Sequence, residues 1–108
     1  MRDEAVWMIH EYMGMAELYY DYGLDVISAP GDLRYKAGRG LLVFDIDRSR
    51  WESNMDLDLR KGDVIITLND LRVGYSPFDL VAMLGRVRGA SAYSMYVYRD
   101  GKFITLAK

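Results

Sequence analysis

The sequence contains no cysteine among its 108 residues, which excludes disulfides, thiolate catalysis and thiolate metal sites. It also lacks an excess of positive charge. Lys and Arg total 14 against 16 Asp and Glu, a net charge of −2, so nucleic acid is not expected as a partner. The longest apolar runs, such as Ala5 to Ile9 and Leu41 to Phe44, are too short for a membrane span or a signal-peptide core. We therefore expect no membrane segment in these residues.

Residues with catalytic or metal-binding chemistry are also few. His10 is the only histidine, and no G-x-S-x-G stretch is present that would supply a serine partner. The run that begins at Asp45 opens like a calcium loop, but Arg50 stands where that loop needs glycine. Asp56 and Asp58 alternate with apolar residues, and no other group converges on them. We expect no catalytic residue, no metal site and no cofactor.

The chain is long enough for one domain, and 51% of its residues are hydrophobic, so it can bury a core without cross-links. Two continuous apolar runs bounded by turn residues predict buried strands, and Asp100-Gly101 predicts a terminal hairpin. The predicted strands are Leu41–Ile46, Val64–Asn69, Ala92–Tyr98 and Phe103–Ala107. Met15–Tyr20 is aromatic-rich and also reads as a strand, whereas Gly23–Gly40 reads as a long connection.

One helix is predicted over residues 77–87, because Ser76 suits the N-cap and Pro77 the first helical position. Its apolar residues form two neighbouring stripes: Leu80, Met83 and Val87, and Pro77, Val81 and Leu84. The second stripe is either a wide core contact or the wall of a groove, and the pattern alone leaves both open. The whole is a small, mainly antiparallel α+β domain with one helix flanking a sheet edge.

The order of these landmarks resembles a known family. Gly40–Phe44, Leu59–Ile65 with its "GDVI", the helix, and Tyr98–Lys102 with its "RDGK" follow the pattern of bacterial PDZ domains of the HtrA/Deg serine proteases. The resemblance implies a PDZ fold, a partly open antiparallel β-barrel or sandwich, over residues 12–108, with residues 1–11 as a linker or lead-in. Trp51–Leu59 departs from the small-residue pattern of the family, which leaves open whether a helix forms there.

The resemblance also implies a peptide-binding site. Tyr12, Met13, Gly14 and Met15 match the family's carboxylate-binding loop, whose backbone N–H groups hold a terminal carboxylate. The next residues would form the strand to which the peptide adds. That strand comprises Ala16, Glu17, Leu18 and Tyr19. Pro77, Val81 and Leu84 match groove-facing positions of the helix, which assigns the second stripe.

The implied function is binding of the C-terminal residues of partner or substrate proteins by a domain without catalytic activity. The implied parent is a bacterial trypsin-like HtrA protease, in which the domain would sense substrates for protein quality control and follow an upstream protease domain. That parent would place the chain in the periplasm or otherwise outside the cytoplasm. The alternative is a docking domain of another membrane or secretion protein, such as a site-2 metalloprotease.

Overall fold

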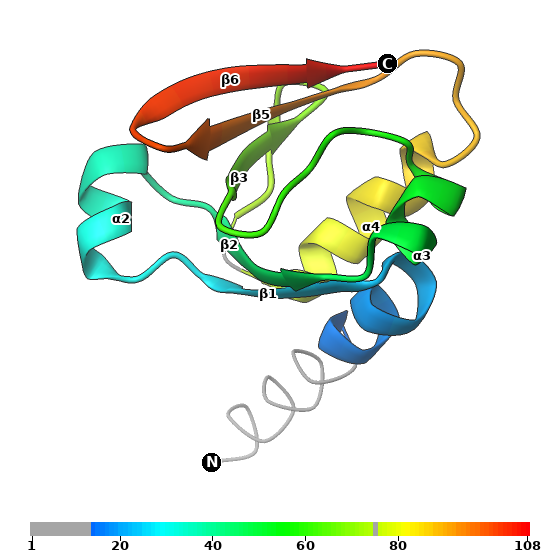
Figure 1. The fold of residues 1–108 in the computed structure, drawn as a ribbon, viewed down its shortest axis with the longest axis horizontal. Coiled ribbons are helices and arrows are strands. Elements are labelled where there is room, and N and C mark those ends of the chain that lie inside the picture. Colours follow the sequence, from blue (N-terminus) through cyan, green and yellow to red (C-terminus); the bar gives the residue numbers. More distant parts are fainter. Residues whose placement is uncertain (1–13, 75) are drawn as a thin grey trace.

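The structure is a computed structural model that describes residues 14–74 and 76–108. Within these residues, an antiparallel sheet of six strands is accompanied by four helices (Figure 1). The strands are β1 (Leu24–Ser28), β2 (Leu41–Ile46), β3 (Val64–Leu68), β4 (Leu71–Arg72), β5 (Ser94–Arg99) and β6 (Lys102–Ala107). The helices are the π-helix η1 (Leu18–Tyr22) and the α-helices α2 (Gly31–Ala37), α3 (Arg48–Asn54) and α4 (Pro77–Val87).

The sheet is open, with the strand order β1-β2-β3-β5-β6, and β4 pairs with β3 away from this path. Among the described strands, β1 and β6 therefore lie at its two ends. The α+β class and the antiparallel arrangement predicted from the sequence are confirmed. β2, predicted as a buried strand, lies between β1 and β3.

Local signals account for α4 and for the terminal hairpin. The Ser76 hydroxyl accepts a hydrogen bond from the backbone N–H of Phe78 at 3.2 Å, and Pro77 begins the helix. The turn between β5 and β6 places Asp100 and Gly101 at φ 51° and 81°, the left-handed conformation that an Asp-Gly turn supplies. Both predictions are confirmed at these positions.

The prediction that residues 23–40 form a long connection is wrong. This segment contains β1 and α2. Leu24 and Val26 are buried on one face of β1, an alternation of only two residues that the surrounding glycines and proline obscured. Ala29, which precedes α2, and Ala37, its last residue, pack with Val64 and Ile66 in a small second core.

The main core lies between the sheet and the helices α3, α4 and η1. Trp51 of α3 is fully buried in it, and the indole Nε1 donates a hydrogen bond to the Leu57 carbonyl at 2.8 Å. The helix α3 covers the first part of Trp51–Leu59, where the sequence left helix formation open, and ends at Asn54. Asp47 caps it by accepting from the Ser49 N–H.

A buried ion pair explains why the "GD" and "RDGK" landmarks occur together. Asp63 is 1% exposed, and its carboxylate accepts hydrogen bonds from Arg99 Nε at 2.8 Å and Nη2 at 2.7 Å. The same carboxylate accepts the backbone N–H of Arg60 at 2.9 Å. This fork-like pairing fixes the loop before β3 to the end of β5.

Candidate functional site

The outer edge of β1 is the part of the sheet where another strand can add. Directly before β1, the Gly23 carbonyl accepts from the Asp47 N–H at 2.7 Å. Directly after it, the Ala29 N–H donates to the Gly40 carbonyl at 3.0 Å. Backbone groups alternate in direction along a strand, so those of Leu24 and Val26 point away from β2. An edge of this kind is a template for pairing with a further chain.

Helix α4 supplies apolar side chains close to this edge. Pro77, Leu80 and Leu84 are buried, and Val81 is half-buried against the main core. Of the predicted groove stripe, Pro77 and Leu84 are thus fully covered in the structure. Leu80, predicted for the core, lies there with Leu24 and with the other buried residues of β1 and α4.

The strand predicted for Ala16–Tyr19 is wrong. Residues 14–17 are α-helical and continue into η1, and we call this continuous element the 14–22 helix. Met15, Ala16, Glu17 and Leu18 all favour helix formation. Leu18 and Tyr22, four residues apart, form its buried stripe. The tyrosines had suggested a strand, but Tyr19 and Tyr20 are exposed on the other side of the helix.

The predicted carboxylate-binding loop is only partly within the described residues, because Tyr12 and Met13 lie outside them. Gly14 and Met15 are helical rather than part of a loop. Gly14 packs against the start of α4, where a Cβ atom would lie 2.5 Å from the backbone nitrogen of Phe78. The glycine therefore permits close contact between two backbones. Carboxylate binding by these residues is not tested by the structure, and the site proposed below does not use them.

The 14–22 helix is attached to α3 by side chains that reach its carbonyl groups. Arg50 Nη1 donates to the Tyr19 carbonyl at 3.2 Å, and Asn54 Nδ2 donates to the Asp21 carbonyl at 2.6 Å. The Arg50 guanidinium also lies 5.2 Å from the centre of the Tyr19 ring. These contacts satisfy carbonyl groups in the last turn, which a helix cannot satisfy by itself.

The turn from this helix into β1, formed by Tyr22, Gly23 and Leu24, was not predicted from the sequence as part of the site. Gly23 has φ 69°, and its N–H donates to the Tyr19 carbonyl at 2.9 Å. Arg88, which follows α4, places its guanidinium 5.7 Å from the centre of the Tyr22 ring. The signal was present, since an aromatic residue, a glycine and the alternating pair Leu24 and Val26 follow one another.

Two titratable groups near this turn have shifted pKa values. Burial raises the pKa of the Tyr22 hydroxyl, and the Arg88 guanidinium offsets part of that rise. Burial also raises the pKa of the Asp25 carboxyl, and the negative charge of Asp45, its partner across β1 and β2, adds to the effect.

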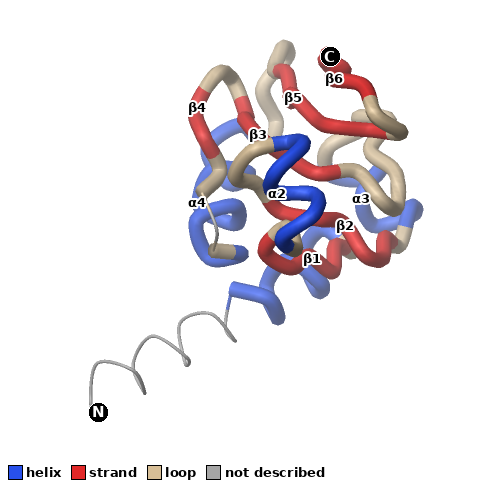
Figure 2. The backbone as a smooth tube through the Cα atoms, turned by 90° about the vertical axis from the view of Figure 1, so that its left-hand side faces the viewer, coloured by secondary structure: helices blue, strands red, loops and turns tan. Residues whose placement is uncertain are grey.

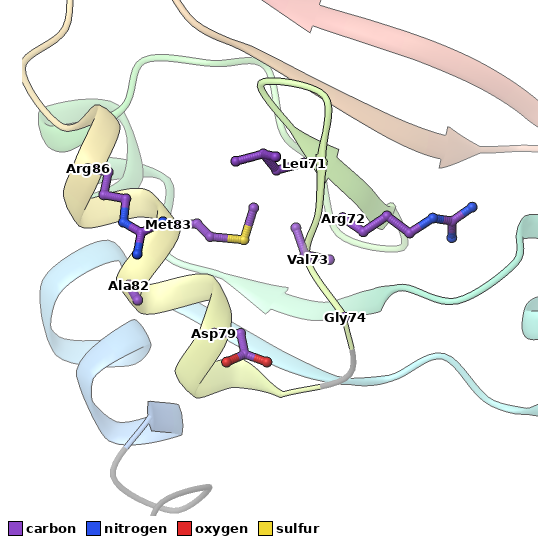
Figure 3. A pocket seen from close by; sticks show the side chains of 8 residues that line it. All are labelled: Leu71, Arg72, Val73, Gly74, Asp79, Ala82, Met83 and Arg86. Atoms are coloured by element: carbon purple, nitrogen blue, oxygen red, sulfur yellow. The ribbon is translucent and has the colours of Figure 1, made fainter.

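Pockets occur on the far side of α4. One of about 290 Å³ lies between α4 and β4, lined by Leu71 and Met83 among others (Figure 3). A second of about 260 Å³ adjoins it and shares both residues. Neither is lined by β1, so neither is the groove that the resemblance implies.

Within the described residues, no group of three or more His, Asp or Glu side chains is placed to hold a metal ion. No helix among them is long and apolar enough to cross a membrane.

An open antiparallel sheet whose edge strand is flanked by one long helix is the architecture of PDZ domains, and the chain has this fold. The HtrA-type protease AlgW, solved with a decapeptide, superposes with a TM-score of 0.58 over 88% of this chain, at 18% sequence identity. A PDZ domain of EpsC from Vibrio cholerae superposes with a TM-score of 0.50 over 98% of this chain and 95% of its own, at 20% identity. The chain spans about a third, 32%, of the AlgW chain. No protein-family model and no curated protein matches the sequence.

Proposed function

We propose that this domain binds the C-terminal segment of a partner protein as an added strand on the outer edge of β1. The observation that carries the proposal is the outer edge of β1, which no further described strand pairs with and where the backbone groups of Leu24 and Val26 point away from β2 beside the apolar side of α4. Strand addition of this kind gives affinity through main-chain hydrogen bonds and specificity through side-chain pockets. The PDZ fold supports the proposal, as does the decapeptide solved with AlgW.

The terminal carboxylate of the peptide would lie at the turn formed by Tyr22, Gly23 and Leu24. A peptide that ends there runs antiparallel to β1, because β1 begins at this turn. The Leu24 N–H points outward, and the Arg88 guanidinium beside Tyr22 supplies a positive charge. Pro77 stands where many animal PDZ domains carry a histidine that selects Ser or Thr, so that preference is not expected.

For the whole protein, we propose a substrate-sensing domain of an HtrA-type protease, in a compartment outside the cytoplasm. The resemblance of the "GDVI" and "RDGK" landmarks supports this. The second candidate is a docking domain of another membrane or secretion protein, with which the PDZ fold, shared with the EpsC domain, is equally compatible. The sequence encoded upstream of this chain separates the two, since a trypsin-like catalytic domain is expected only for the first.

The test is a library of decapeptides with free C-termini, screened by fluorescence polarisation, with amidated copies of every hit. We expect amidation to weaken binding at least tenfold. Arg88→Gln should lower the affinity for free-acid peptides several-fold and leave the amidated copies unchanged, since an ion pair made by an exposed side chain such as Arg88 contributes about 0.2–1 kcal/mol. Arg86→Gln is the matched control, because Arg86 lines the pocket on the far side of α4. Equal binding of the free-acid and amidated peptides would contradict the proposed carboxylate site.

A further inference from the structure

The 14–22 helix lies along the edge where the peptide would add. Its first described residue, Gly14, contacts Phe78 in the first turn of α4, and its last, Tyr22, lies beside Arg88 just after α4 ends. The helix therefore runs in the same direction as α4, and β1 returns the opposite way after Gly23 (Figure 1). Figure 2 shows the helix below the gap between α4 and β1. This is the direction proposed for a bound peptide, with the carboxylate end at the same turn.

The helix also occupies the apolar surface that a ligand side chain would need. Leu18 is 0% exposed and Tyr22 3%. Both belong to the same apolar cluster as Leu24 of β1 and Leu84 of α4. The helix therefore packs in the same core as Leu84, which the groove prediction placed on an accessible wall.

At the start of α4, the two backbones leave no room for a third chain. A single methyl group at Gly14 would come within 2.5 Å of the Phe78 nitrogen and 2.6 Å of its Cα. An added strand lies roughly 4.8 Å from its neighbour and carries side chains besides. The last turn of the helix, η1, also contacts both β1 and α4, the two elements that would hold the peptide. A peptide on the β1 edge and the 14–22 helix in its present place therefore compete for the same space.

We infer that the 14–22 helix is a built-in occupant of the peptide site and that a peptide binds only when this helix moves away. The inference rests on the proposed function and adds its regulation. One residue, Gly23 in the left-handed conformation, joins the helix to β1 and can serve as the hinge. The last turn is a π-helix, a rare geometry that is frequent at functional sites.

The contacts that hold the helix closed lie partly outside the site. Arg50 and Asn54 belong to α3 and touch the helix through the carbonyls of Tyr19 and Asp21. Neither residue lies on β1 or α4, so their removal loosens the closed state without changing the groove. Anything that engages the exposed side of α3 at these two residues would open the site in the same way.

The first test compares the double variant Arg50→Ala, Asn54→Ala with Glu52→Ala, a matched control whose only described partner is Arg48 within α3. The probes are the tightest free-acid decapeptides from the library above. Apparent affinity scales with the open fraction, so loss of both hydrogen bonds should tighten binding about tenfold in the double variant and leave the control unchanged.

Gly14→Ala separates helix formation from helix packing. Alanine favours the helix by roughly 1 kcal/mol over glycine, yet its methyl group would push the helix off Phe78. Tighter peptide binding supports the inference. Weaker binding shows instead that a stronger helix closes the site more firmly without the Phe78 contact, and the packing argument fails.

Amide hydrogen exchange measures directly whether the 14–22 helix moves when a peptide binds. Addition of peptide to the unaltered protein should accelerate exchange of the amides of residues 18–22 and leave β3 and β5 unchanged. If peptides bind, while exchange of these residues stays the same or slows and the double variant gains no affinity, the inference is wrong and the proposed function stands. If neither the unaltered protein nor any folded opened variant binds a peptide, the proposed function fails first.

Discussion

At the scale of single residues, the contact with the greatest expected energetic effect is the pair between Asp63 and Arg99. The Arg99 side chain is 13% exposed and that of Asp63 1%, so removal of the arginine leaves a buried carboxylate without its counter-charge. Motif reading marked both residues as landmarks of a family. Only the structure shows that the two residues are joined by a buried ion pair.

We expect Arg99→Met to lower the free energy of unfolding by about 3 kcal/mol, measured by urea denaturation. Arg60→Met is the control, because Arg60 pairs with Asp58 at the surface, with side chains 58% and 53% exposed. An exposed pair of this kind contributes less than about 1 kcal/mol. Equal losses for the two variants would contradict the buried-pair interpretation.

The aspartates Asp25 and Asp45 face each other across β1 and β2, which gives a pH dependence of opposite sign to that of an ion pair. The pKa of Asp25 is raised in the folded state, by burial first and by Asp45 second. The folded protein therefore binds this proton more readily than the unfolded chain does. The contribution to stability is lost as the pH rises from the unfolded pKa through the folded pKa.

Asp45→Asn should stabilise the protein by a few tenths of a kcal/mol at pH 7, because like charges directly opposite on neighbouring strands repel. The gain should disappear at low pH, where the Asp25 carboxyl, whose pKa is raised, is protonated and the repulsion is lost. Thermal melting at pH 7 and pH 3 measures it. Asp70→Asn, at an exposed turn position with φ 66°, is the control that should show no such pH-dependent gain.

At the scale of elements, the sequence predicted correctly those helices, turns and strands that a few neighbouring residues determine. The cap and proline before α4, the Asp-Gly turn and the continuous runs of β2 and β3 were each sufficient. The 14–22 helix and β1 were not predicted, because their stability comes from contacts made elsewhere. Leu18 and Leu24 are both buried in the main core. Each element has only two such buried apolar residues in sequence, and this short pattern specifies a helix or a strand only once the core has packed around it.

The helix α4 contains a position where its stability can be raised. Gly85 is exposed, and a Cβ atom there would meet nothing within 4 Å. Gly85→Ala should therefore raise the free energy of unfolding by roughly 0.5–1 kcal/mol through helix propensity, as measured by urea denaturation. The comparison is Gly40→Ala, where a Cβ atom would lie 2.5 Å from the Ile65 carbonyl oxygen, and which should destabilise. A loss at Gly85 would show that the glycine has a packing role.

At the scale of the whole molecule, the fold predicted from the sequence is confirmed, and the predicted carboxylate-binding loop stays a prediction. The PDZ resemblance rested on the order in which the strands, the helix and the "GDVI" and "RDGK" motifs follow one another in the sequence. The site prediction placed its glycine at Gly14, whereas the site proposed from the structure uses Gly23, and each of the two glycines lies within two residues of a tyrosine and directly before an apolar residue. Only the structure shows that Gly14 contacts α4 and that Gly23 directly precedes β1.

The single-residue link at Gly23 has a consequence for how the domain would choose among ligands. Closure by the 14–22 helix is a unimolecular event, so dilution of the protein does not alter it. It reduces the apparent affinity of every peptide by the same factor, the inverse of the open fraction. A library ranked against the unaltered domain and against an opened variant should therefore give the same order. On this view the helix sets the threshold for binding, and β1 with α4 sets the preference.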